Sequence, residues 1–191
     1  MIKPVWAATL AAILLATATC ACAADVPNWT VDFTKSRLGF SGTQTGQPFQ
    51  GAFARYNAAI AFDPAHPEAS HIKVTVDLSS ATTGDTQRDT ALPGDDWFDI
   101  AHFPQASFAS DSIRKKPDGS YEAIGTLTMR GISHPLTLPF TLDVNGTSAH
   151  AKGHATLIRT AFGIGQGQWA TADYVALEVG IDIDIVAARA K

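Results

Sequence analysis

Apolar and polar residues alternate along most of the chain. The clearest case runs from Val175 to Ile185, where every second residue is aliphatic and acidic residues such as Asp182 and Asp184 share the other face. Alternation with a period of two is typical of a β-strand with one buried face and one face in water. Because similar runs recur, the apolar faces must close on one another around either a packed core or an apolar ligand.

The other alternating segments predict about eight strands in total, joined mostly by short turns. In chain order, they cover 29–33 with an extension to 40, 56–62, 72–78, 106–116, 121–129, 136–144 and 151–157. Asn145-Gly146 is the strongest hairpin signal, and the segment 117–119 is a second clear turn. The pattern predicts one all-β domain, an antiparallel barrel or a sandwich.

The segment 83–104 differs from the rest because its alternation stops. Asp85 or Thr86 can cap the start of a helix, and Pro93-Gly94 would end it. The apolar residues here are too few for a core of their own but numerous enough to plug the end of a barrel. We therefore expect one short helix and a loop.

The first 23 residues are typical of a secretory signal peptide. Lys3 supplies a positive charge near the start, an Ala- and Leu-rich apolar stretch follows, and Ala21-Cys22-Ala23 resembles a cleavage site. These features predict cleavage before Ala24 and export to a bacterial periplasm or beyond. A retained membrane anchor would need roughly 20 apolar residues, and threonines and cysteines interrupt this run earlier. A lipid-modified Cys20 is a lesser alternative.

Cleavage would leave a single domain, 24–191, without cysteine. That domain carries 13 basic and 18 acidic residues, a formal net charge of −5, and no basic run. This charge argues against nucleic-acid binding and against electrostatic docking on anionic lipid headgroups. With about 168 residues, it is long enough for a sizeable core without disulfides.

Signals for catalysis, metals or cofactors are weak. His150 and His154 share a strand face but would stand roughly 13 Å apart, too far to bind one ion, so no metal site and no cofactor is predicted. Arg88, Asp89 and Arg159 can be read in two ways. They are either solvated surface charges or polar groups at a cavity mouth that hold a lipid headgroup.

A series of motifs spread over nearly the whole domain resembles the YceI family. The motifs are Asp32-x-x-x-Ser36, Gly51-x-Phe53, Phe62-Asp63-Pro64, Thr86-Gln-Arg88-Asp89, Trp97-Phe98-Asp99, Phe103-Pro104-Gln-Ala-Ser-Phe108, Gly125-Thr-Leu127-Thr-Met-Arg130-Gly131 and Arg159-x-x-Phe162-Gly163. Two positions depart from the family pattern, because Lys35 and Ala91 stand where histidine is frequent. Headgroup contacts of those histidines cannot be carried over.

The resemblance implies a lipocalin-like, extended antiparallel β-barrel in the periplasm, whose apolar cavity binds an isoprenoid quinone or a polyprenyl phosphate. Small residues that we expect to point inward, such as Ala123, Ala151 and Gly153, would leave room for such a chain. The candidate wall residues are Phe40, Phe53, Phe62, Phe108, Leu127, Met129, Leu138, Phe140 and Leu142, with Trp97, Phe98, Phe162 and Trp169 near the closing loops. Each of them could equally be plain core.

Burial of one isoprene unit is worth roughly 3 to 4 kcal/mol against water. Since a bilayer solvates the same chain nearly as well, we expect mouth residues to set selectivity, and transient contact with a membrane or membrane protein to accompany lipid exchange. The hypothesis is an exported, non-catalytic carrier of unknown oligomeric state. Two alternatives stay open: a secreted enzyme for a lipophilic substrate that uses Arg159 or Asp89, and a stress-related interaction module with a filled core.

Overall fold

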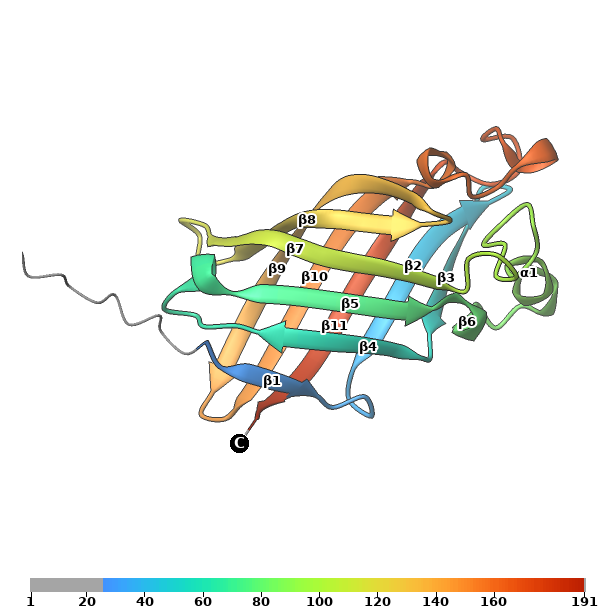
Figure 1. The fold of residues 1–191 in the computed structure, drawn as a ribbon. Helices are drawn as coiled ribbons and strands as arrows, with labels where there is room; N and C mark the ends of the chain where they lie inside the picture. The colour runs from blue at the N-terminus through green and yellow to red at the C-terminus, as the bar shows by residue number, and fades with distance from the viewer. Residues whose placement is uncertain (1–25, 191) are drawn as a thin grey trace, which may run out of the picture.

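Within residues 26–190, eleven strands form one antiparallel sheet that curls into an elongated barrel, with one α-helix at one end (Figure 1). This computed structural model describes residues 26–190. The predicted signal peptide, 1–23, and its cleavage point lie outside the described residues. The expected all-β fold with one short helix is confirmed.

The elements follow the alternation closely in most of the chain. The strands are β1 (Asn28–Val31), β2 (Arg37–Gln44), β3 (Gln47–Phe53), β4 (Tyr56–Ala61), β5 (His71–Asp77), β6 (Ala81–Thr82), β7 (Gln105–Lys115), β8 (Tyr121–Met129), β9 (Ile132–Asn145), β10 (Ser148–Ile158) and β11 (Glu178–Arg189). The helix is α1 (Thr86–Ala91), and four short 3₁₀ helices are η1 (Pro67–Ala69), η2 (Leu78–Ser80), η3 (Arg159–Phe162) and η4 (Gly167–Trp169).

Eight of these strands close the barrel, in the order β1, β4, β5, β7, β8, β9, β10 and β11. Closure depends on β11, which pairs with β10 along one edge and, along the other, first with β2 and then with β1. Between those two partners, the Ser36 hydroxyl takes over the pairing and exchanges hydrogen bonds with the Val186 backbone at 2.9 and 3.2 Å. Strands β2, β3 and β6 therefore extend the sheet at the end of the barrel that carries α1.

The first predicted strand is two strands. Residues 32–36 turn the chain between β1 and β2, and the glycine-rich stretch that follows is a long hairpin, β2–β3, with its turn at Thr45 and Gly46. The last strand also differs from the prediction, because β11 begins at Glu178 and not at Val175. Val175 forms only an isolated bridge with Gln44.

The helix and the turns match the local signals. The Asp85 side chain caps α1 by accepting a hydrogen bond from the Arg88 amide at 2.9 Å. Gly146, in the β9–β10 turn, has φ +60°, and Gly119, in the β7–β8 turn, has φ +86°, conformations that favour glycine. None of the helices formed by residues 26–190 is long and apolar enough to cross a membrane.

Candidate ligand-binding cavity

The interior of the barrel contains two apolar cavities. The barrel cavity, of about 110 Å³, lies among β1, β2, β4, β5 and β7–β11. The end cavity, of about 100 Å³, lies beneath the loops beside α1 and is lined by aromatic residues of β2, β3 and the segment 92–98. A third hollow, the mouth pocket of about 80 Å³, adjoins the end cavity and shares Phe49, Leu92, Trp97 and Val175 with it.

The two apolar cavities follow one another along the barrel. On β2, Leu38 lines the barrel cavity and Phe40, two residues on, lines the end cavity. On the other side of the interior, the core residues Leu127 and Leu136 line neither cavity and lie between them. The interior is thus hollow in two places and filled between them, which is neither an open tunnel nor a solid core.

The size of each cavity decides how much of a ligand it can hold. An apolar cavity of about 150 Å³ is known to admit a benzene-sized hydrocarbon, so each of these cavities suits a short hydrocarbon segment. A chain longer than one cavity would need core side chains between the two, such as Leu127 and Leu136, to move aside.

Most of the predicted wall residues line a cavity. Five line the barrel cavity: Phe62, Phe108, Leu138, Phe140 and Leu142. Five line the end cavity: Phe40, Phe53, Trp97, Phe98 and Met129. Trp169 lines the mouth pocket, whereas Phe162 is buried against the imidazole of His134 and lines none of the three. Their contact with a ligand stays a prediction.

Arg88 lies at the mouth pocket, and its contact with a headgroup stays a prediction. Its side chain lines the mouth pocket, stacks over the Phe49 ring at 4.8 Å and remains partly exposed. The Nε atom donates to the Thr83 hydroxyl and one Nη1 proton goes to Gln44, both at 3.1 Å. Since a guanidinium carries five N–H groups, these two bonds leave donors that a ligand in the mouth pocket can use.

Asp89 has a different task from the one expected of a headgroup residue. Its carboxylate accepts hydrogen bonds from the Thr82 hydroxyl and from both the amide and the hydroxyl of Thr83, each at 2.7 Å. These bonds, the Thr83 hydroxyl above all, hold the pKa of Asp89 below its ordinary value. Asp89 lines none of the three pockets, and it fixes the connection between β6 and α1.

Arg159 is neither a surface cation nor an available headgroup donor. The side chain is buried, and its three nitrogens donate to backbone carbonyls only. The acceptors are the carbonyl oxygens of Ile164, Gly165, Trp169, Thr171, Val175 and Ala176, at 2.6 to 3.4 Å. All five N–H groups therefore hold the loop between β10 and β11 and are not free to donate to a headgroup, although the side chain also lines the end cavity.

Sequence reasoning missed several lining residues. Tyr56 lines the barrel cavity from β4, and Gln44, Thr83 and Gln87 add polar groups to the mouth pocket. The alternation had placed Tyr56 on the same strand face as Ala58 and Phe62, which is the signal that could have identified it. The glutamines carried no such signal, because a glutamine at a strand end or in a short helix is normally a surface residue.

Each of the two histidines on β10 pairs with an aspartate on the neighbouring strand, β11. His150 Nε2 lies 2.5 Å from Asp184 Oδ1, and His154 Nδ1 lies 2.7 Å from Asp182 Oδ1. Both pairs are on the water-facing side of the barrel. Within residues 26–190, no group of three or more His, Cys, Asp or Glu side chains is arranged to hold a metal ion.

This fold and this interior define a lipocalin-like β-barrel with internal apolar cavities. The chain matches the model of the YceI-like domain over residues 29–187 and belongs to that family. A UPF0312 protein of Pseudomonas savastanoi pv. phaseolicola is 29% identical over 158 residues, which cover 80% of this chain and 79% of the relative. A UPF0312 protein of Yersinia pestis is 33% identical over 116 residues, 61% of this chain and 57% of the relative.

Solved structures agree on the fold. Burkholderia cenocepacia BcnA superposes with a TM-score of 0.80 at 34% identity, over 83% of this chain and all of that one. The YCEI protein of Campylobacter jejuni gives a TM-score of 0.63 at 25% identity, over 74% of this chain and 84% of that one. A polyisoprenoid-binding domain from Saccharophagus degradans gives a TM-score of 0.65 at 13% identity, over 86% of this chain and 99% of that one. This likeness is one of fold alone.

Proposed function

We propose that the protein is an exported, non-catalytic carrier that holds the hydrocarbon chain of an isoprenoid lipid inside its barrel and the polar end of that lipid at the mouth pocket. The observation that carries the proposal is the series of three hollows. Two are apolar and lie inside the barrel, and the third is bordered by Arg88. A polyisoprenoid-binding neighbour with the same fold supports the choice of ligand class.

Hydrophobic transfer supplies the affinity for the chain. Each isoprene unit that leaves water contributes roughly 3 to 4 kcal/mol before the costs of association and of displacing core side chains. A few buried units would therefore bind tightly from water. Against a bilayer, this gain nearly vanishes, so extraction from a membrane depends on polar contacts and on the shape of the cavities.

Arg88 is the group best placed to recognise the polar end. A guanidinium binds a phosphate or carbonyl oxygen through charge-assisted hydrogen bonds, and the Phe49 ring fixes its plane. Gln44 and Gln87 border the same pocket and can donate further hydrogen bonds. The periplasm, where the predicted signal peptide would direct the chain, is the compartment in which such a carrier would move lipid between membranes.

The direct test is native mass spectrometry of the protein purified from its own host without detergent, followed by solvent extraction of the bound fraction. We expect about one prenyl lipid per barrel, retained through purification without detergent. Recovery of the protein with no prenyl lipid, together with failure to take up added polyprenol from solution, would reject the carrier. Chemical conversion of an added polyprenol by the purified protein would instead favour an enzyme.

A further inference from the structure

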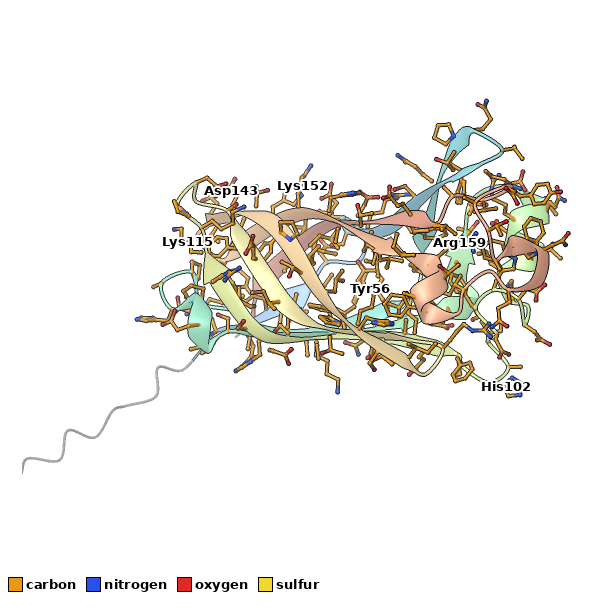
Figure 2. The ribbon with its side chains drawn as sticks, turned by 90° about the horizontal axis from the view of Figure 1, so that it is seen from above. Tyr56, His102, Lys115, Asp143, Lys152 and Arg159 are labelled. Carbon is orange, nitrogen blue, oxygen red and sulfur yellow. The ribbon has the colours of Figure 1, made fainter. Side chains whose placement is uncertain are left out.

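The Tyr56 hydroxyl is a polar group without a partner inside an apolar space. Tyr56 lines the barrel cavity, and its Oη atom is buried and makes no hydrogen bond to any residue that the structure describes. Figure 2 places Tyr56 about midway along the barrel, between the end that carries Lys115 and the end that carries Arg159. A buried hydroxyl without a partner is costly, and native proteins rarely keep one without a reason.

Nearby polar groups do not take up this hydroxyl. The Ser36 hydroxyl lies beside the Tyr56 phenol, but both of its hydrogen bonds go to the backbone of Val186. The indole N–H of Trp29, which lines the same cavity, donates to the Phe62 carbonyl at 2.8 Å. The Tyr56 ring itself is held by an edge-to-face contact with Phe33 at 5.1 Å. Burial raises the pKa of the Tyr56 phenol above its ordinary value, and the neighbouring Ser36 hydroxyl offsets only part of that rise, so the phenol remains a hydrogen-bond donor at neutral pH.

We propose that Tyr56 determines the kind of chain that the barrel accepts, because its hydroxyl donates a weak hydrogen bond to the π face of a prenyl double bond. The inference rests on the proposed function and specifies it further: the preferred ligand is an unsaturated isoprenoid chain and not a saturated chain of equal length. Since the headgroup stays at the mouth pocket, only the chain reaches Tyr56.

The spacing of a prenyl chain suits this contact. A polyprenyl chain carries one double bond in each isoprene unit, so in any register one double bond lies within about half a repeat of the hydroxyl. A saturated chain fills the same space but leaves the hydroxyl buried and unpaired. Any water held by Tyr56 is displaced by both chains, and its loss therefore does not affect the difference between them.

The test compares two ligands with one headgroup. A polyprenol of defined length and the same alcohol after full hydrogenation are titrated into the delipidated full-length protein. We expect the unsaturated alcohol to bind about threefold to fivefold more tightly, as for a weak hydrogen bond to a π system. In the Tyr56→Phe variant, this ratio should fall to about one, because the ring and its contact with Phe33 remain and only the hydroxyl is lost.

Tyr121→Phe is the matched control, since Tyr121 is also buried but lines neither cavity, and this variant should keep the preference. A second readout uses the unmodified protein with ¹³C-labelled tyrosine. The Cζ resonance of Tyr56 should shift with the unsaturated alcohol to a different position from that with its hydrogenated form.

Four outcomes separate the two proposals. A preference lost only in Tyr56→Phe supports the inference. Equal binding of both alcohols to the unmodified protein overturns it while the carrier proposal stands. An equal loss of affinity for both alcohols in Tyr56→Phe overturns it too, because the hydroxyl would then contact the headgroup oxygen. Failure of both alcohols to bind the unmodified protein rejects the carrier proposal itself.

Discussion

Gly51 on β3 lies directly opposite Phe40 on β2, and the Phe40 ring occupies the space where a side chain at residue 51 would stand. The ring also lines the end cavity. A glycine at this position therefore allows a large aromatic side chain to lie flat against the sheet and keeps the cavity beside it open.

Replacing that glycine should fill the end cavity without unfolding the barrel. In Gly51→Ala, the new methyl group displaces the end of a side chain that has open space beside it, so the cost should be about 1 to 2 kcal/mol of unfolding free energy. The displaced Phe40 ring would narrow the path of a chain, and polyprenol affinity should fall at least tenfold. Titration of a polyprenol and urea unfolding measure the two effects.

Gly125→Ala is the contrasting variant. A methyl group there meets the Ala109 carbonyl oxygen and the Ser110 backbone, which cannot swing away as a ring can. This variant should be much less stable than Gly51→Ala. If Gly51→Ala binds polyprenol as well as the unmodified protein does, Phe40 and the end cavity are not on the path of the chain.

Arg88 should distinguish lipids by the charge of their headgroup. In Arg88→Gln, the loss of a charge-assisted hydrogen bond should weaken binding of a polyprenyl phosphate about tenfold or more, whereas the uncharged polyprenol of the same length should lose little. Competition titrations at two salt concentrations would measure both. The difference between the losses of affinity for the phosphate and for the alcohol should shrink at high salt, because salt screens charges in a mouth pocket that is partly open to solvent.

Lys115→Gln controls for the general loss of one positive charge, because Lys115 lies at the opposite end of the barrel (Figure 2). It should affect neither lipid. An equal weakening of phosphate and alcohol by Arg88→Gln would mean that Arg88 supports the shape of the mouth and does not recognise the headgroup.

Arg159 should be a stability residue. Arg159→Met keeps much of the length and apolar contact of the side chain but removes every donor to the six carbonyl groups of the β10–β11 loop. Because several buried acceptors lose their partner, we expect a loss of about 3 kcal/mol or more in urea unfolding. Arg114→Met, at an exposed ion pair with Glu122, should cost at most about 1 kcal/mol. Similar costs for the two variants would contradict the anchoring role.

Alternation along the chain was enough to predict most of the barrel, because a strand with one dry face leaves a period of two wherever the pairing is regular. It failed where backbone groups bond to something other than a neighbouring strand. Val175 alternates with the residues that follow it, yet its carbonyl and that of Ala176 accept from Arg159. Because these carbonyls bond to Arg159, β11 begins three residues later than the pattern predicts.

The candidate site was predictable in its apolar part only. Residues such as Phe40 and Phe140 had to face inward once their strands were placed, and the cavities lie where these side chains fail to fill the interior. The polar residues Arg88, Asp89 and Arg159 had indistinguishable signals in the sequence. Their hydrogen-bond partners decide which of them lines the mouth pocket and which hold loops. For Arg88, that partner is Gln44, which lies 44 residues away in the sequence.

Asp89 makes the loop before α1 sensitive to acid. Hydrogen bonds to the ionised carboxylate lower the pKa of Asp89 in the folded protein, so its contribution to stability is complete above the unfolded value of about 4 and is lost as the pH falls through the folded value. Asp89→Asn should therefore be less stable than the unmodified protein at pH 7, and the difference in urea midpoint should shrink steadily between pH 5 and pH 2.

The comparison of the two proteins isolates Asp89, because the effects of the other aspartates are the same in both and cancel in the difference between the midpoints. Asp111→Asn is the control, since the structure gives the Asp111 side chain no hydrogen bond or ion pair within residues 26–190. A difference between unmodified protein and Asp89→Asn that stays constant over this range would show that the three bonds from Thr82 and Thr83 do not depend on the charge of Asp89.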